Sequence, residues 1–127
     1  MIVKSFEIKK IDLSKKKLIL FYGQNEGLKD ENISKLTANF QNLLKYQEKE
    51  ILDNSEDFLN SLFSGSLFDE NKFIIINQAT DKIIKILEIL IEKKNQLDNI
   101  VILFNANTLE KRSKIRSIFE KELVCVP

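Results

Sequence analysis

The residues best placed to do chemistry lie between Gly23 and Asp30, directly after a run of five apolar residues. A phosphate-binding loop follows the pattern G-x-x-x-x-G-K-[ST], in which glycines let the backbone approach the phosphates, lysine binds them and a hydroxyl binds magnesium. When the pattern is aligned on Gly23, its lysine falls at Lys29. Leu28 stands in place of the second glycine and Asp30 in place of the hydroxyl residue. The pattern therefore fails at two positions that matter chemically.

Charge also argues against nucleotide binding at this loop. The carboxylates of Asp30 and Glu26 would repel a phosphate, and the Cβ of Leu28 would keep the backbone away from it. Acidic residues are favoured at a helix N-terminus by the helix dipole, so a simple strand-to-helix turn is the preferred interpretation. The alternative is a P-loop-type nucleotide-binding enzyme with an aberrant phosphate loop.

The other predicted strand ends carry no ionisable side chains. Ligands bind beyond the carboxyl ends of parallel strands, and an ATPase keeps acidic residues there to organise magnesium and water. In this chain those ends are Asn77-Gln78 and Asn105-Ala106-Asn107. Asp53 could serve a phosphoacceptor site, but it is better explained as a helix cap three residues before Glu56. We therefore predict no catalytic residue and no enzymatic activity.

Composition excludes several further kinds of site. The chain has no histidine, and therefore no histidine general base or metal ligand. Its single cysteine, Cys125, rules out an internal disulfide and a cysteine-rich zinc site, and is expected to be a small core residue in a reducing compartment. With 20 basic and 19 acidic residues, the net charge of +1 creates no global attraction to nucleic acid or a membrane. We expect neither a metal nor a cofactor.

The elements that would position these residues follow from apolar runs separated by helical patterns. Apolar strands without alternation predict a parallel sheet covered on both faces. We predict an α/β fold, a three-layer sandwich with a mostly parallel sheet of about five strands, in one domain spanning residues 1–127. The expected strands are 18–22, 48–52, 73–76, 100–104 and 123–126, and the expected helices are 27–49, 53–65, one beginning at 81, and 109–122.

No transmembrane segment or signal peptide is expected. The most apolar stretch, 83–91, is interrupted by two charges and is too short to span a bilayer. The N-terminus has no apolar region of the length that a signal peptide needs. A cytoplasmic location is therefore expected.

Leu67 and Phe68 are two large apolar residues in a segment predicted to connect a helix to a strand. Neither helical nor strand periodicity explains them. They either pack under the sheet as ordinary core or form an exposed anchor for a protein partner.

Four cations lie within six residues near the start of the last helix, at Lys111, Arg112, Lys114 and Arg116. This is the unfavourable helix end for positive charge. A solvated helix face is the preferred explanation, and a contact with DNA phosphates or an acidic partner is the alternative.

Three segments together resemble the N-terminal domain of the delta subunit of bacterial DNA polymerase III, a clamp-loader subunit. They occur in the family's order and span nearly the whole chain, and the third is the most specific. The segments are Leu20-Phe21-Tyr22-Gly23-x-Asn25-Glu26-Gly27-Leu28, Ser66-Leu67-Phe68, and Lys111-Arg112-Ser113-Lys114-Ile115-Arg116-x-x-Phe119-Glu120.

The resemblance implies an AAA+-type fold, related to P-loop ATPases, whose nucleotide site is degenerate. It implies that Leu67 and Phe68 insert into a hydrophobic pocket on the ring-shaped sliding clamp, the beta subunit. That contact would help open the ring for loading onto primed DNA during replication. Family members often carry Gly and Arg after this pair, where this chain has Asp69-Glu70-Asn71-Lys72.

The resemblance also implies further partners. These are the other clamp-loader subunits and the DNA that the assembled loader contacts. The resemblance implies no contact with a membrane. The helical and collar domains that follow in the family are absent from this chain. We therefore expect it to be the N-terminal part of a longer protein.

Overall fold

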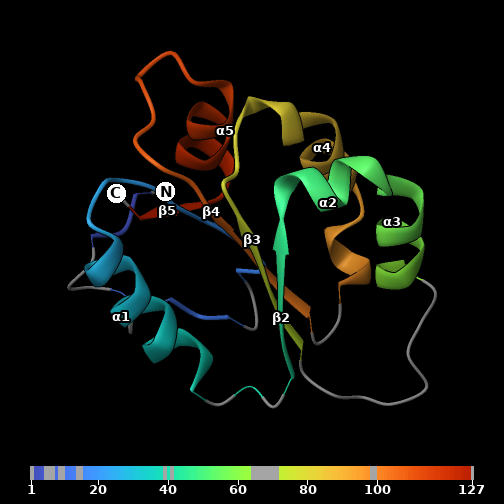
Figure 1. Ribbon diagram of the computed structural model, residues 1–127, viewed down its shortest axis with the longest axis horizontal. Coiled ribbons are helices and arrows are strands. Elements are labelled where there is room, and N and C mark those ends of the chain that lie inside the picture. The colour runs from blue at the N-terminus through green and yellow to red at the C-terminus, as the bar shows by residue number, and fades with distance from the viewer. Residues whose placement is uncertain are drawn as a thin grey trace.

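The computed structural model describes residues 2–4, 8, 11–13, 16–38, 40, 42–63, 72–97 and 100–126, the last of these ranges without the side chains of 122 and 124–126. Strands and helices alternate along these residues (Figure 1). The strands are β1 (Leu18–Phe21), β2 (Asn42–Gln47), β3 (Lys72–Asn77), β4 (Ile100–Asn105) and β5 (Val124–Val126). The α-helices are α1 (Glu26–Thr37), α2 (Glu48–Asp53), α3 (Ser55–Phe63), α4 (Ile84–Glu92) and α5 (Lys114–Glu122), with short 3-10 turns η2 (Asp81–Ile83) and η3 (Lys94–Gln96).

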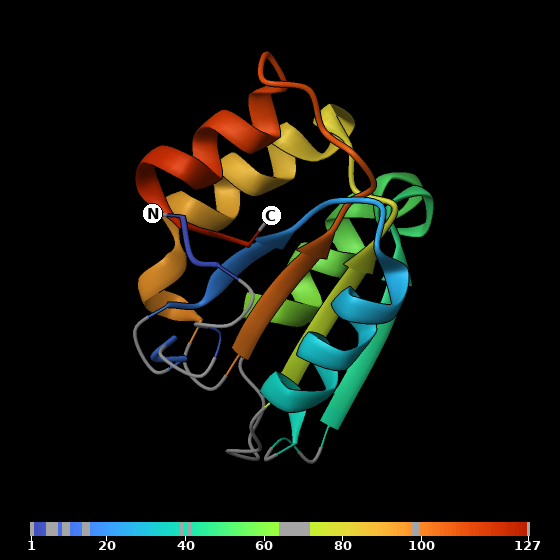
Figure 2. The same cartoon turned by 90° about the vertical axis from the view of Figure 1, so that its left-hand side faces the viewer.

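The sheet is parallel throughout. Strands β2, β3, β4 and β1 lie side by side in that order, and the three-residue β5 pairs with the other edge of β1. After β1 the chain moves to the far edge, and after β2 it moves back across the sheet. Because crossovers between parallel strands are right-handed, the two directions of travel place their helices on opposite faces. Helix α1 accordingly lies on one face, together with the N-terminal residues Val3, Ile8 and Ile11, while α2 to α5 cover the other (Figures 1 and 2).

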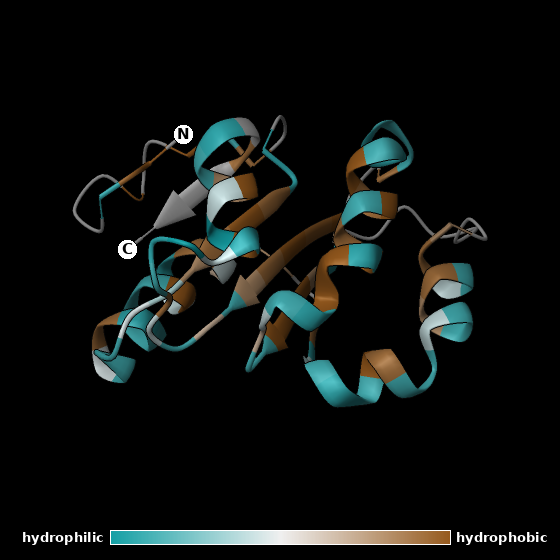
Figure 3. Ribbon diagram, turned by 90° about the horizontal axis from the view of Figure 1, so that it is seen from above, coloured by the Kyte–Doolittle hydropathy of each residue, from teal (hydrophilic) through white to brown (hydrophobic). Residues whose placement is uncertain are grey.

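Each central strand contributes to two separate hydrophobic clusters. Along β3, Phe73 and Ile75 pack with Ile33 and Leu36 of α1, whereas Ile74 and Ile76 pack toward α2 to α5. Successive side chains of a strand point to opposite faces, so a strand buried on both faces must be apolar at every position. Figure 3 shows these hydrophobic strands enclosed by helices with hydrophilic outer surfaces. Three layers follow from this arrangement.

The structure corrects the predicted helix over 27–49. Helix α1 ends at Thr37, and Leu43 and Leu44 belong to the edge strand β2. The strand expected at 48–52 is wrong as well, because α2 occupies Glu48–Asp53. Asp53 is therefore the last residue of α2, and the predicted cap at the start of the next helix is replaced by a break at Asn54.

The predicted last helix begins later than expected. The structure starts α5 at Lys114, so residues 109–113 precede the helix. Within it, Ile115 and Phe119 are fully buried and Ile118 is partly buried, and Leu123, the residue after the helix, is 9% exposed. Among the described helices, none combines the length and the apolar character that a bilayer crossing requires.

Candidate functional site

The loop after β1 lies at the switch point of the sheet. The chain leaves β1 toward α1 on one face and leaves the neighbouring β4 toward α5 on the other. Open α/β sheets bind their ligands in the crevice between two such strands. The Gly23–Asp30 loop therefore occupies the place predicted for it. Gly23 has a φ of +125°, which side chains with a Cβ rarely adopt.

Lys29 fills this crevice with its own side chain. The residue is only 6% exposed. Its Nζ donates to the carbonyl oxygen of Ala106 at 2.9 Å, across the switch point, and lies 2.9 Å from Oε1 of Glu26. The amine that a phosphate loop would direct at a nucleotide is thus hydrogen-bonded to Ala106 and ion-paired with Glu26.

Four backbone donors of the loop are also engaged. Asn25 caps α1, because its Oδ1 accepts from the amide of Leu28 at 3.0 Å and its carbonyl accepts from the amide of Lys29. The amide of Gly23 donates to Asn107, and that of Glu26 to Gln24. A phosphate cradle depends on free N–H groups, and these four are used.

The space beside the loop is small. The cavity it lines has a volume of about 110 Å³, against roughly 300–1,000 Å³ for small-molecule sites. Leu28 and Lys29 are among its lining residues. Asp30, at the position where a phosphate loop has a hydroxyl, is exposed on α1. The cavity beside the loop is therefore smaller than the sites that usually hold small molecules.

The strand ends opposite the loop carry an amide pair. Asn77 and Asn105 are register partners at the carboxyl ends of β3 and β4, and Nδ2 of Asn105 donates to Oδ1 of Asn77 at 3.0 Å. The Oδ1 of Asn105 is buried and has no hydrogen-bond partner among the described residues. Two neutral amides supply neither a general base nor the anionic oxygens that magnesium prefers.

Glu48 is a buried carboxylate that the sequence reasoning missed. It begins α2 and is 6% exposed. Its two oxygens accept from the hydroxyl of Thr80 at 2.7 Å and from the backbone amide of Thr80. A buried charge is tolerated when it is hydrogen-bonded in this way. Glu48 therefore ties the end of β2 to the turn after β3.

Asp81 caps α5 from a different part of the chain. Its carboxylate accepts from the hydroxyl of Ser113 and the amide of Ile115, both at 3.0 Å, and from the amide of Lys114. Desolvation raises the pKa of Asp81, but these hydrogen bonds and the charge of Lys114 outweigh it, so the pKa lies below its usual value. A negative charge at this helix end offsets the cations that the sequence places there.

The four cations of the basic segment separate into two groups. Lys111, Arg112 and Lys114 are exposed, and Arg112 pairs with Glu110 at 2.8 Å. Arg116 instead donates to Glu120 at 2.8 Å and to the carbonyl of Leu109 at 3.0 Å, and its guanidinium lies over the ring of Tyr22 at 5.1 Å. Arg116 is thus a structural residue, while the other three face solvent.

The predicted clamp-binding pair, Leu67 and Phe68, lies outside the described residues. Phe63 at the end of α3 and Lys72 at the start of β3 bound that segment. The prediction for this pair therefore stays a prediction.

Comparisons with known proteins do not assign the chain to a family. No protein family and no curated protein matches it. Among solved structures it is similar to C. elegans PCH-2, with a TM-score of 0.48 and 14% identity over 96% of this chain. The chain spans 38% of the length of that protein. A similarity of this size carries no argument about function.

Proposed function

We propose that this chain is a non-catalytic AAA+-like domain of a clamp-loader subunit, which binds the sliding clamp of DNA polymerase III and helps open it for loading. The proposal that the domain is non-catalytic rests on Lys29. Its amine is bound to Ala106 and Glu26 instead of being available to a nucleotide. The uncharged pair Asn77 and Asn105 supports it, since magnesium would find no carboxylate there.

Clamp binding rests on the sequence resemblance. In this proposal Leu67 and Phe68 form the anchor, and the buried parallel sheet acts as its rigid support. Aromatic and aliphatic anchors at the centre of an interface typically account for ~2–4 kcal/mol when truncated. That range corresponds to a loss of affinity of about 30- to 1,000-fold.

A clamp pull-down with the double variant Leu67→Ala/Phe68→Ala tests the anchor. We expect binding to be abolished while thermal unfolding stays cooperative. The matched control is Leu43→Ala/Leu44→Ala, which truncates two apolar residues that are 41% and 39% exposed elsewhere on the surface. The assignment is wrong if the first variant still binds the clamp or no longer folds, or if the control loses binding equally.

Calorimetric titration with Mg-ATP tests the competing nucleotide-binding enzyme. We expect no saturable heat, because four of the loop amides and the Lys29 amine are already engaged. Micromolar binding would favour the enzyme instead.

A further inference from the structure

Strand β2 forms an open edge of the sheet. Its ladder is with β3, and among the described residues no strand lies on its other side. It exposes Leu43 and Leu44, which are 41% and 39% accessible. An edge strand that has no neighbouring strand on one side and carries exposed apolar residues is a template for a strand from another chain.

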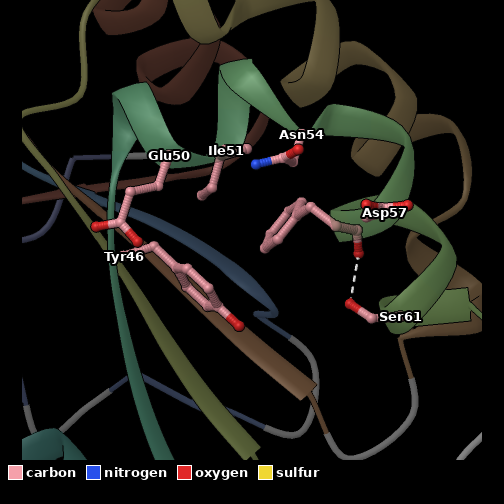
Figure 4. A pocket seen from close by; sticks show the side chains of 7 residues that line it. Tyr46, Glu50, Ile51, Asn54, Asp57 and Ser61 are labelled. Atoms are coloured by element: carbon pink, nitrogen blue, oxygen red, sulfur yellow. Dashed lines mark hydrogen bonds between the residues drawn. The ribbon is translucent and has the colours of Figure 1, made fainter.

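A pocket of about 400 Å³ lies beside this edge, between β2 and helices α2 and α3 (Figure 4). Tyr46, Ile51 and Phe58 supply its apolar surface. The rings of Tyr46 and Phe58 meet edge to face, with centroids 5.6 Å apart. Leu44 lies two residues before Tyr46 and so shares its face of the strand. The apolar surface therefore continues from the pocket along β2.

The rim of the pocket is acidic. Glu50 and Asp57 lie on opposite sides of it in Figure 4, and the Asn54 side chain lies between them. One oxygen of Glu50 accepts from the amide of Gln47 at 3.3 Å. The carboxylate of Asp57 makes no hydrogen bond or ion pair with the described residues. Both carboxylates can therefore accept from a ligand.

The local charge differs from that of the whole chain. Residues 42–57, which include β2, α2 and the start of α3, contain five carboxylates and two lysines, although the chain as a whole has a net charge of +1. Opposite charge steers and selects the partner of such a surface. A basic segment fits here, and an acidic one would be repelled.

We propose that the open edge of β2 binds an extended basic peptide segment of a partner protein, which adds a strand beside β2 and places an arginine or lysine in the Tyr46–Phe58 pocket. The aliphatic stem of the cation packs against the two rings, where a cation is also attracted by the ring faces. Its head group meets Glu50 and Asp57. Residues of the peptide that alternate with the cation lie on the Leu43 face of the strand.

Nuclear magnetic resonance titration of the 15N-labelled chain tests this proposal with the probe acetyl-Thr-Val-Arg-Val-Thr-amide. We expect saturable shifts in 42–47 and in α2 and α3. The same peptide with glutamate in place of arginine should show none. The variant Glu50→Gln/Asp57→Asn should weaken binding about tenfold or more. Gln at position 50 can still accept the capping hydrogen bond.

The matched control is Asp53→Asn/Glu56→Gln, which removes the same charge from the same helices but outside the pocket lining. Its affinity should stay within twofold of the parent. If both double variants weaken peptide binding equally, the proposed site is wrong and the peptide is held by a general electrostatic attraction to the acidic surface. Absence of saturable shifts, or shifts confined to other elements, would overturn it as well.

Strand addition has its own control. A peptide N-methylated at alternate residues, so that it cannot donate to β2, should lose binding, and retained binding would refute an added strand. This inference does not depend on the proposed function. Clamp binding should be unaffected in Glu50→Gln/Asp57→Asn, so the two proposals fail separately.

Discussion

Replacing Lys29 with methionine separates a structural lysine from a ligand-binding one. Methionine keeps most of the buried stem but removes the ammonium, which is hydrogen-bonded to Ala106 at 2.9 Å. A hydrogen bond from a charged donor contributes about 1.5–3 kcal/mol. The carbonyl of Ala106 would lose this donor at a residue that is 1% exposed. The ion pair adds little, because the side chain of Glu26 is 59% exposed and such pairs contribute roughly 0–1 kcal/mol.

Part of this loss is offset, because Lys29→Met no longer has to bury a charge on folding, and burying a charge costs free energy. We therefore expect Lys29→Met to lower the free energy of unfolding by about 1–2 kcal/mol. Urea unfolding followed by circular dichroism measures this difference. The control Glu26→Gln should change the free energy of unfolding by less than about 0.5 kcal/mol, because it removes only an exposed partner.

Two results would refute this account of Lys29. One is a Lys29→Met variant whose free energy of unfolding equals that of the parent. The other is a parent chain that binds Mg-ATP at micromolar concentration and loses that binding in the variant. The first result would show that the contact with Ala106 is dispensable, and the second would restore Lys29 as a phosphate ligand.

Two further predictions concern α5. Asp81→Ala should lower the free energy of unfolding by about 1 kcal/mol through loss of the cap. Because folding lowers the pKa of Asp81, its contribution is present above the unfolded pKa of about 3.9 and is lost as pH falls through the folded pKa. The difference between parent and variant, measured by urea unfolding, should therefore shrink below pH 4 or so; an undiminished difference at pH 2 would contradict this. If the exposed cations contact DNA, the variant Lys111→Gln/Arg112→Gln/Lys114→Gln should bind primed duplex more weakly in the assembled loader. The slope of log affinity against log salt concentration should fall by the equivalent of up to about three phosphate contacts. The control Arg116→Gln should mainly lower the free energy of unfolding. Fluorescence anisotropy at several salt concentrations measures this slope of log affinity against log salt concentration. An unchanged slope would exclude these residues from the DNA contact.

The buried strands could be predicted because their sequences admit no other environment. Leu18 to Phe21, Phe73 to Ile76 and Val101 to Phe104 are apolar at every position, which a strand needs only when both faces are covered. The edge strand gave no such signal. Leu36, Phe40, Leu43 and Leu44 follow helical spacing by coincidence, and β2 is too exposed to show a strand pattern of its own.

The candidate site could be predicted in position but not in detail. The turn at Gly23 and the failed phosphate pattern are local, so the sequence shows them directly. The contact between Lys29 and Ala106 joins residues 77 positions apart in the sequence. The hydrogen bonds between Asp81 and the start of α5 join residues more than 30 positions apart. Glu48 was interpreted only as part of a weak strand, since nothing near it in sequence indicates its bonds to Thr80. Such pairings depend on the sheet order, which local patterns do not encode.

The strand order has a consequence for how the chain is made. β1 is the first strand to be synthesised, yet its two neighbours, β4 and β5, follow more than 80 residues later. Until then Leu18 to Phe21 have no lateral partner, and non-local pairing of this kind slows folding. A nascent chain that ends before residue 100 carries an apolar strand with both edges open, a state prone to aggregation. The β1 side of the finished sheet, completed by β5, is thus the last part that translation allows to close.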